Sequence, residues 1–159
     1  HNDLQKSLPR IPLLVNTEKY ISIGNQLASI HINYESQPIL NEISLSTVVD
    51  PNYKVTKMKH PKNGQEELLD TIIFNDDITI RTIPVEAYSY LVNGSSAIHT
   101  IMDQYCIKTE NAINITEDPN DFSENPKYIL NLLLSIITVS IRTLELINDL
   151  PKFELLEKE

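Results

Sequence analysis

The feature that most constrains the fold is a long apolar segment framed by two prolines. Residues 128–141 are apolar except for a few small hydroxyl and amide side chains, and they lie between Pro126 and Pro151. Proline is tolerated in the first turn of a helix but disrupts a helix interior. We therefore predict one helix over residues 127–150. Its apolar side chains cover more than one face, so it must be buried on several sides.

The same segment bears on membrane association. A membrane-spanning helix needs about 20 consecutive, predominantly apolar residues. The strongly apolar run here has about 14 and contains polar side chains. We therefore expect a core helix and no membrane partner.

A second helix is predicted in the N-terminal part of the sequence. Apolar side chains recur at spacings of three and four residues from Tyr20 to Tyr34, and Pro38 ends the segment. This spacing is typical of one face of an amphipathic helix. We expect this helix, residues 17–35, to pack against helix 127–150 as the main core, and both helices to cover a sheet.

The segments between the two helices predict a small antiparallel sheet. Strand-like stretches at 53–58, 69–74 and 78–83 are separated by turn signals at Asn63-Gly64 and Asn75-Asp76-Asp77. The other predictions are a loop or short strand at 39–50, short helices at 84–92 and 97–105, and an irregular acidic loop at 107–125. The fold class is therefore α+β, a small antiparallel sheet packed with long helices in one domain.

The chain of 159 residues is long enough for one domain. We divide it into an N-terminal helical part (1–50), the meander (51–83) and a second helical part (84–159). It opens on His1 instead of methionine, and we expect it to be a piece of a larger protein. The single cysteine, Cys106, permits no internal disulfide and fits a reducing cytoplasm. We expect a monomer.

No arrangement of residues in the sequence predicts a reaction. The three glycines are too far apart for a phosphate-binding loop or a dinucleotide fingerprint. The four histidines are scattered, and none has a second histidine or a cysteine at zinc-ligand spacing. The acidic loop lacks the central glycine of a calcium loop. We therefore predict that this chain is not itself an enzyme and has no cofactor and no metal site.

The charge of the chain is unevenly distributed. The net charge is −9, which opposes DNA binding overall because DNA affinity draws on neutralised phosphates. Residues 51–65 nevertheless contain no acid, and they carry four lysines and a histidine: Lys54, Lys57, Lys59, His60 and Lys62. A domain polarised in this way can present one basic edge to a polyanion.

An ordered set of short motifs gives the chain a family resemblance. The motifs are Pro9 to Pro12, Tyr20 to Glu35, Lys57 to Lys59, Thr71 to Asn75, Ala87 to Ile98, Asp103 to Tyr105, Asp118 to Asn120, and Val139 to Thr143 with Leu150-Pro151. Their order and spacing over residues 9–151 resemble the C-terminal specificity domain of type ISP restriction–modification enzymes. Those enzymes are single polypeptides with a nuclease, a helicase-like ATPase, an adenine methyltransferase and a target recognition region.

The resemblance implies a domain that reads double-stranded DNA for methylation and cleavage carried out by other domains of the parent chain. We expect the four lysines to contact phosphates, and His60 and Asn63 to offer hydrogen bonds to base edges. Two alternatives remain open. The lysines can instead protect an edge strand from aggregation, or the chain can be an interaction module that braces the methyltransferase or the rest of the recognition region without touching bases.

Overall fold

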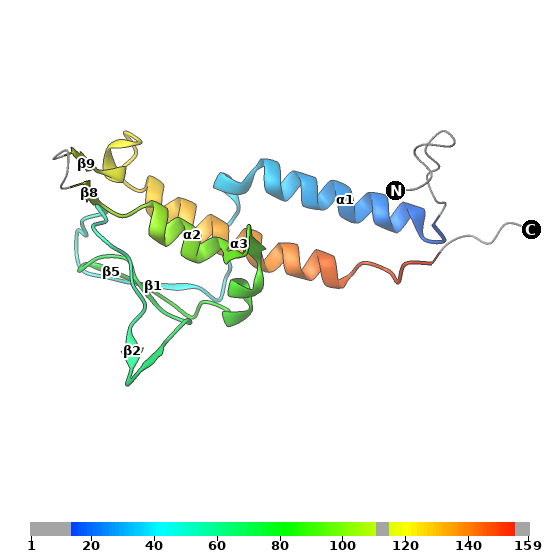
Figure 1. Cartoon of the computed structure of the whole chain (residues 1–159), viewed down its shortest axis with the longest axis horizontal. Coiled ribbons are helices and arrows are strands. Elements are labelled where there is room, and N and C mark those ends of the chain that lie inside the picture. The colour runs from blue at the N-terminus through cyan, green and yellow to red at the C-terminus, as the bar shows by residue number, and fades with distance from the viewer. Residues whose placement is uncertain (1–13, 111–114, 155–159) are drawn as a thin grey trace, which may run out of the picture.

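The computed structural model of the chain describes residues 14–110 and 115–154 (Figure 1). The motif at Pro9 to Pro12 lies outside the described residues. The helices are α1 (Thr17–Ile32), α2 (Ala97–Gln104) and α3 (Tyr128–Asn148), with short 3-10 turns η1 (Tyr34–Ser36), η2 (Val85–Ser89) and η3 (Pro119–Asp121). The strands are β1 (Ser44–Thr47), β2 (Lys62–Asn63), β3 (Glu66–Glu67), β4 (Ile72–Ile73), β5 (Ile78–Arg81), β6 (Leu91–Val92), β7 (Ser95–Ser96), β8 (Lys108–Glu110) and β9 (Ile115–Glu117).

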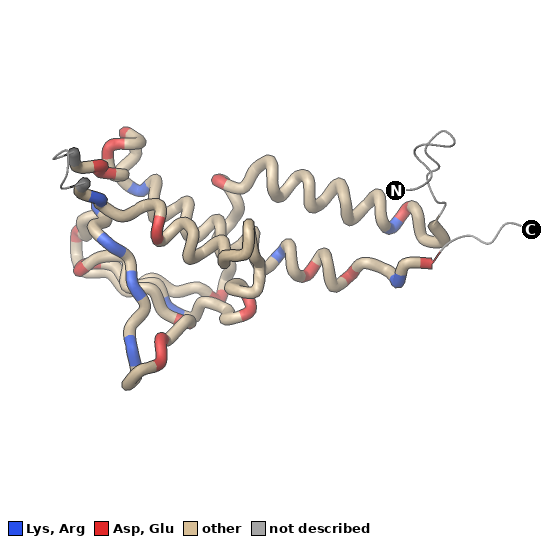
Figure 2. Tube along the Cα trace, in the orientation of Figure 1, with Lys and Arg blue, Asp and Glu red and all other residues tan. Residues whose placement is uncertain are grey.

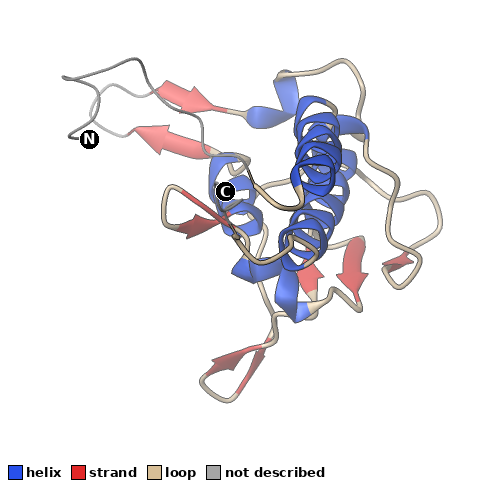
Figure 3. Cartoon of the chain, turned by 90° about the vertical axis from the view of Figure 1, so that its right-hand side faces the viewer, coloured by secondary structure: helices blue, strands red, loops and turns tan. Residues whose placement is uncertain are grey.

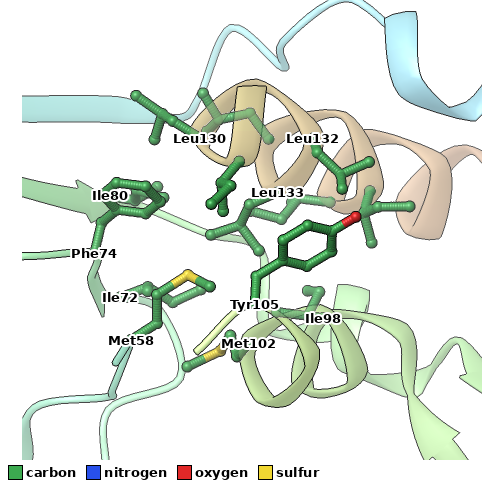
Figure 4. Close-up of a cluster of buried hydrophobic side chains, with 14 of the residues drawn as sticks. Met58, Ile72, Phe74, Ile80, Ile98, Met102, Tyr105, Leu130, Leu132 and Leu133 are labelled. Atoms are coloured by element: carbon green, nitrogen blue, oxygen red, sulfur yellow. The ribbon is translucent and has the colours of Figure 1, made fainter. Parts of the chain in front are cut away.

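Helix α3 forms the centre of the hydrophobic core, as its proline-framed apolar sequence predicts. It is buried along most of its length, and side chains of the sheet and of α2 pack against it. Figure 4 shows Leu130, Leu132 and Leu133 of α3 facing Ile80 of the sheet and Ile98 of α2. The α+β class with a single domain is thereby confirmed, and Figure 3 shows the strands arranged around the helices.

The buried hydroxyl groups of α3 are hydrogen-bonded, to backbone carbonyls or to a side chain, instead of being left unpaired. The Ser135 hydroxyl donates to the carbonyl of Tyr34 at 2.6 Å, and Thr138 donates to the carbonyl of Pro38 at 2.9 Å. Thr143 is hydrogen-bonded to Nε2 of His31 at 3.0 Å. These contacts attach the end of α1 and the turn after it to α3, so the small polar residues within the apolar run have a structural role.

Helix α3 is also long and apolar enough to cross a membrane by length and composition alone. An 18-residue window within it has a mean hydropathy of 1.7, but 61% of that window is buried inside the protein. The core helix of a globular domain has the same composition, because both environments remove apolar side chains from water. The packing of α3 against the sheet accounts for its composition without a membrane.

The main sheet differs from the predicted meander in one of its three strands. Its order is β1-β5-β4, and both pairings are antiparallel. The predicted stretches 69–74 and 78–83 contain β4 and β5, but the third strand is β1 and not 53–58. Residues 53–58 belong to no strand: the chain bends at Thr56, and asparagine side chains hydrogen-bond to the backbone of Lys54 and Val55. Directly after this stretch, Lys59 forms an isolated bridge with Ile73 of β4.

Short hairpins occur at two places where the sequence predicted other structure. The helix predicted over 84–92 is only the 3-10 turn η2, and β6 then pairs with β7 across the turn at Asn93-Gly94. Both of these residues have positive φ, which a helix excludes and a tight turn needs. The acidic loop predicted over 107–125 contains the paired strands β8 and β9 and the turn η3. Residues 111–114 of that loop lie outside the described residues.

The predicted contribution of α1 to the main core is wrong. Helix α1 does pack along α3 (Figure 1), but Ile23 is its only buried residue and does not belong to the core cluster. The apolar side chains of the sheet and α2 already cover much of α3, so only part of the α3 surface remains for α1. Ile21 and Ile32 of α1 therefore stay 57% and 79% exposed.

The fold predicts at which positions shortening a side chain lowers the free energy of unfolding. Leu133 and Ile137 have no exposed surface, so Leu133→Ala and Ile137→Ala should each lower the free energy of unfolding by about 2–5 kcal/mol. Chemical denaturation measures this change. Ile21→Ala, at an exposed position of α1, is the control and should stay within about 0.5 kcal/mol of the parent chain. An unchanged midpoint in both α3 variants would contradict the assigned core.

Candidate nucleic-acid interface

The first part of the lysine-bearing segment, before a bend at Thr56, is held by two asparagine side chains. The Asn120 amide pairs with Val55 as a neighbouring strand would: its Oδ1 accepts from the Val55 amide at 2.9 Å, and its Nδ2 donates to the Val55 carbonyl at 2.8 Å. The Asn75 amide donates to the carbonyls of Asn52 and Lys54 at 2.7 and 2.9 Å. The segment thus has a defined backbone although it lies outside the sheet.

Farther along, the segment alternates between inward and outward side chains. Met58 is 3% exposed and His60 is 7% exposed, whereas Lys57 and Lys59 are exposed. Lys59 is fixed by two backbone hydrogen bonds to Ile73, of 2.8 and 3.1 Å. Residues two apart in extended backbone share a face, so the two lysines point outward together. Figure 2 shows basic positions following one another along this side of the molecule, toward the β2–β3 hairpin.

His60 lies inside the protein and not on its surface. Its Nδ1 is 2.8 Å from the carbonyl of Thr71, and because a carbonyl only accepts, this nitrogen carries the hydrogen. The His60 ring packs edge-on against Tyr88 and His99, with ring centroids 5.5 Å away in both cases. Burial, together with the charge of Asp70, raises the pKa of the Tyr88 hydroxyl, so Tyr88 remains neutral. This packing joins the lysine segment to α2.

Two of the four candidate lysines lie close to acids. Lys62 forms an ion pair with Glu67 across the β2–β3 hairpin, with 3.5 Å between Nζ and Oε1. Lys54 lines a hollow that is also lined by Asp76, Asp77 and Asp118. Nearby carboxylates offset the positive potential that these lysines offer a polyanion. Lys57 and Lys59 have no ion pair within the part of the chain that the structure describes.

The structure adds Lys108 to the candidate set. The amide of Ile107 donates to the carbonyl of Thr56 at 2.9 Å, which places the start of β8 directly beside the lysine segment. Lys108 is exposed. Lys108 lies 46 or more residues from the other candidate lysines in sequence, so sequence reasoning could not group it with them; the tertiary hydrogen bond brings its strand beside their segment. A hollow of about 620 Å³ next to it is lined by polar residues of β7, α2 and β8.

Asn63, the other predicted base-contacting residue, is exposed at the end of the β2–β3 hairpin. Gly64 follows with φ +66°, as the predicted tight turn requires. The structure therefore brings Lys57, Lys59 and Lys108 together, leaves Asn63 accessible at a hairpin tip, and buries His60. The alternation of Met58 and His60 was the sequence signal that could have predicted an inward histidine. Within residues 14–110 and 115–154, no cluster of three or more potential metal ligands is found.

A small α+β domain with an outward lysine edge beside a polar helix defines a candidate nucleic-acid-recognition domain. The family model of the type ISP C-terminal specificity domain matches residues 1–132. The chain therefore belongs to the family of type ISP C-terminal specificity domains. No curated protein sequence matches it.

The chain is also similar to solved structures of type ISP enzymes. One is a nuclease-deletion mutant of the type ISP restriction–modification enzyme LlaGI in complex with a DNA substrate mimic; it is 59% identical over 98% of this chain, with a TM-score of 0.84. The ATP-dependent type ISP enzyme LlaBIII bound to DNA is 57% identical over 97% of the chain, with a TM-score of 0.83. The chain spans only 12% and 10% of those two proteins.

A more distant structure shares the fold. The DrdV–DNA complex is 20% identical over 94% of this chain, and the chain spans 16% of that protein. The TM-score is 0.70, so the arrangement of helices and strands persists where most side chains differ.

Whether Asn120 holds the Val55 backbone can be tested by measuring the stability of an Asn120 variant. Asn120→Ala removes both partners of the Val55 backbone, and Val55 is only 1% exposed. Leaving buried backbone groups unpaired should cost about 1–3 kcal/mol, and hydrogen exchange at the Val55 amide should accelerate. Asn131→Ala, at an exposed position of α3, is the matched control. Unchanged protection of Val55 in the Asn120 variant would show that the amide does not hold this segment.

Proposed function

We propose that this chain is the DNA-sequence-reading part of a longer restriction–modification protein, and that methylation and cleavage are carried out by other domains of that protein. The observation that carries the proposal is the identity of 57–59%, over nearly the whole chain, to type ISP enzymes solved with DNA. In this proposal the chain has no catalytic residue of its own, acts in the cytoplasm, and works as a single copy within its polypeptide.

The charge arrangement supports contact with a DNA backbone. Lys57, Lys59 and Lys108 are exposed, and both segments that carry them are tied together by the hydrogen bond from Ile107 to Thr56. Phosphate contacts position a protein on DNA without reading its sequence. We assign that role mainly to these three lysines, with smaller contributions from Lys54 and Lys62, and we keep Asn63 as a residue able to reach a base edge.

The burial of His60 gives it a different role in this proposal. Its ring lies behind Lys59 and is bonded to Thr71, so it supports the segment from within. Loss of the ring would disturb the positions of the lysines without removing a contact to DNA.

A second candidate function, bracing other domains of the same polypeptide, is favoured by the outward face of α1. From Tyr20 to Ile30 this helix has no charged residue. Ile21 and Ile32 are 57% and 79% exposed, and Gly24 has open space around it. Exposed apolar surface of this kind is typical of an interface. The bracing function would use α1, and the DNA contact would use the lysine segment and β8. Both functions can therefore operate in one domain.

The phosphate role predicts a change in salt dependence. In the full-length protein that carries this domain, Lys57→Ala, Lys59→Ala and Lys108→Ala should each reduce the slope of log affinity against log salt concentration by about 0.9. Titration of a labelled, mixed-sequence duplex at several salt concentrations measures the slope.

Two matched variants serve as controls for that titration. Lys19→Ala, which removes an exposed charge from α1, should leave the slope unchanged, and Lys62→Ala should have a smaller effect because Glu67 already pairs with Lys62. If a variant that combines Lys57→Ala, Lys59→Ala and Lys108→Ala retains both the affinity and the slope of the parent protein, the lysine edge does not contact DNA. The bracing function would then be the better explanation of the domain.

A further inference from the structure

Helix α2 has an outward face composed almost entirely of hydrogen-bonding side chains. Its inward residues Ala97, Ile98 and Met102 are buried in the core. The opposite face carries Thr100, Asp103 and Gln104, all exposed, and the half-buried His99. These four side chains line the hollow of about 620 Å³ that Lys108 also borders.

Two side chains on this face, those of Asp103 and Gln104, make no hydrogen bond with other described residues. The Thr100 hydroxyl donates back to the carbonyl of Ser96 at 3.0 Å. Amide side chains can bond in a bidentate manner to adenine, carboxylates accept from the amino group of cytosine, and a threonine methyl can contact thymine. The face therefore offers a different kind of contact for each of several bases.

The face is also firmly placed. The His99 ring lies 5.1 Å from the Tyr88 ring and 5.5 Å from the His60 ring, and His60 is itself bonded to Thr71. The inward side of α2 packs against α3. A residue that reads a base edge has to be held in position by its surroundings before DNA arrives, and these contacts provide that support from both sides of the helix.

Exposed lysines that form no ion pair among the described residues lie on one flank of this face. Lys108 borders the hollow, and Ile107 joins its strand to the segment that carries Lys57 and Lys59. A helix whose polar face is flanked by phosphate-binding residues matches the way helices enter the major groove. The acid Asp103 would repel phosphates, but it suits a position facing an amino group of a base edge.

We propose that the outward face of α2 reads base edges, with Gln104 and Asp103 as specificity-determining residues. This inference rests on the proposed DNA-reading function and assigns that function to a particular helix. It moves base reading away from the buried His60, and it predicts that α2 and the lysine edge affect binding in different ways.

The test uses the full-length protein that carries this domain and a pool of duplexes with a randomised central segment. Bound duplexes are selected and sequenced for the parent protein and for Gln104→Ala and Asp103→Ala. Each variant should lose discrimination at one or two base pairs of the enriched motif by about 5- to 150-fold, the range expected for one base contact. The rest of the motif should remain.

Two control variants separate base reading from other effects. Gln26→Ala makes the same change at an exposed position of α1 and should enrich the parent motif unchanged. Lys57→Ala should weaken binding to all duplexes while it preserves the motif. Circular dichroism of every variant should match the parent protein, since alanine suits an exposed helical position and Lys57 is an exposed residue outside the helices.

The outcomes distinguish this inference from the function on which it rests. Relaxation confined to particular positions of the motif supports α2 as the reading helix. An unchanged motif with unchanged discrimination in both α2 variants overturns it, while the DNA-reading function stands. If the parent protein enriches no sequence at all, the proposed function fails and the assignment of α2 fails with it.

Discussion

The burial of α3 determines where the other elements can lie. Its side chains are apolar on nearly all sides, so the chain must surround it to remove that surface from water. The sheet and α2 supply most of the cover, and hydrogen bonds from Ser135 and Thr138 attach the turn after α1. The lysine segment and α2 occupy positions defined by this packing. Their outward faces are therefore carried on a rigid interior.

A second constraint acts on the lysine segment itself. Segments outside a sheet normally leave backbone groups to water, but here Asn120 and Asn75 take the place of a neighbouring strand. These bonds occupy backbone groups of Asn52, Lys54 and Val55, which another strand could otherwise pair with. Directly beyond them, Lys57 and Lys59 lie on one face. Asn75 and Asn120 thus contribute to the candidate interface without touching a ligand.

The acidic character of the domain and its proposed affinity for DNA are compatible because the charges are separated. Acids lie near Lys54 and Lys62, and Glu117 lies opposite Lys108 in the β8–β9 ladder, whereas Lys57 and Lys59 have no ion pair among the described residues. In a longer protein other domains can supply most of the electrostatic attraction. A weakly basic edge then has mainly to orient the domain, and the discrimination between sequences falls to polar side chains such as those of α2.

The sequence by itself determined the α+β class, the three helices and the position of the basic segment, because helical periodicity, prolines and local charge are properties of neighbouring residues. Tertiary structure alone decided that β1 replaces residues 53–58 in the sheet, that His60 faces Tyr88 and His99, and that Lys108 joins the lysine edge. These outcomes depend on contacts between residues far apart in the chain. The side chains of Asn75 and Asn120 bond to backbone groups that a neighbouring strand would otherwise use, and each lies 21 or more residues from the group it binds.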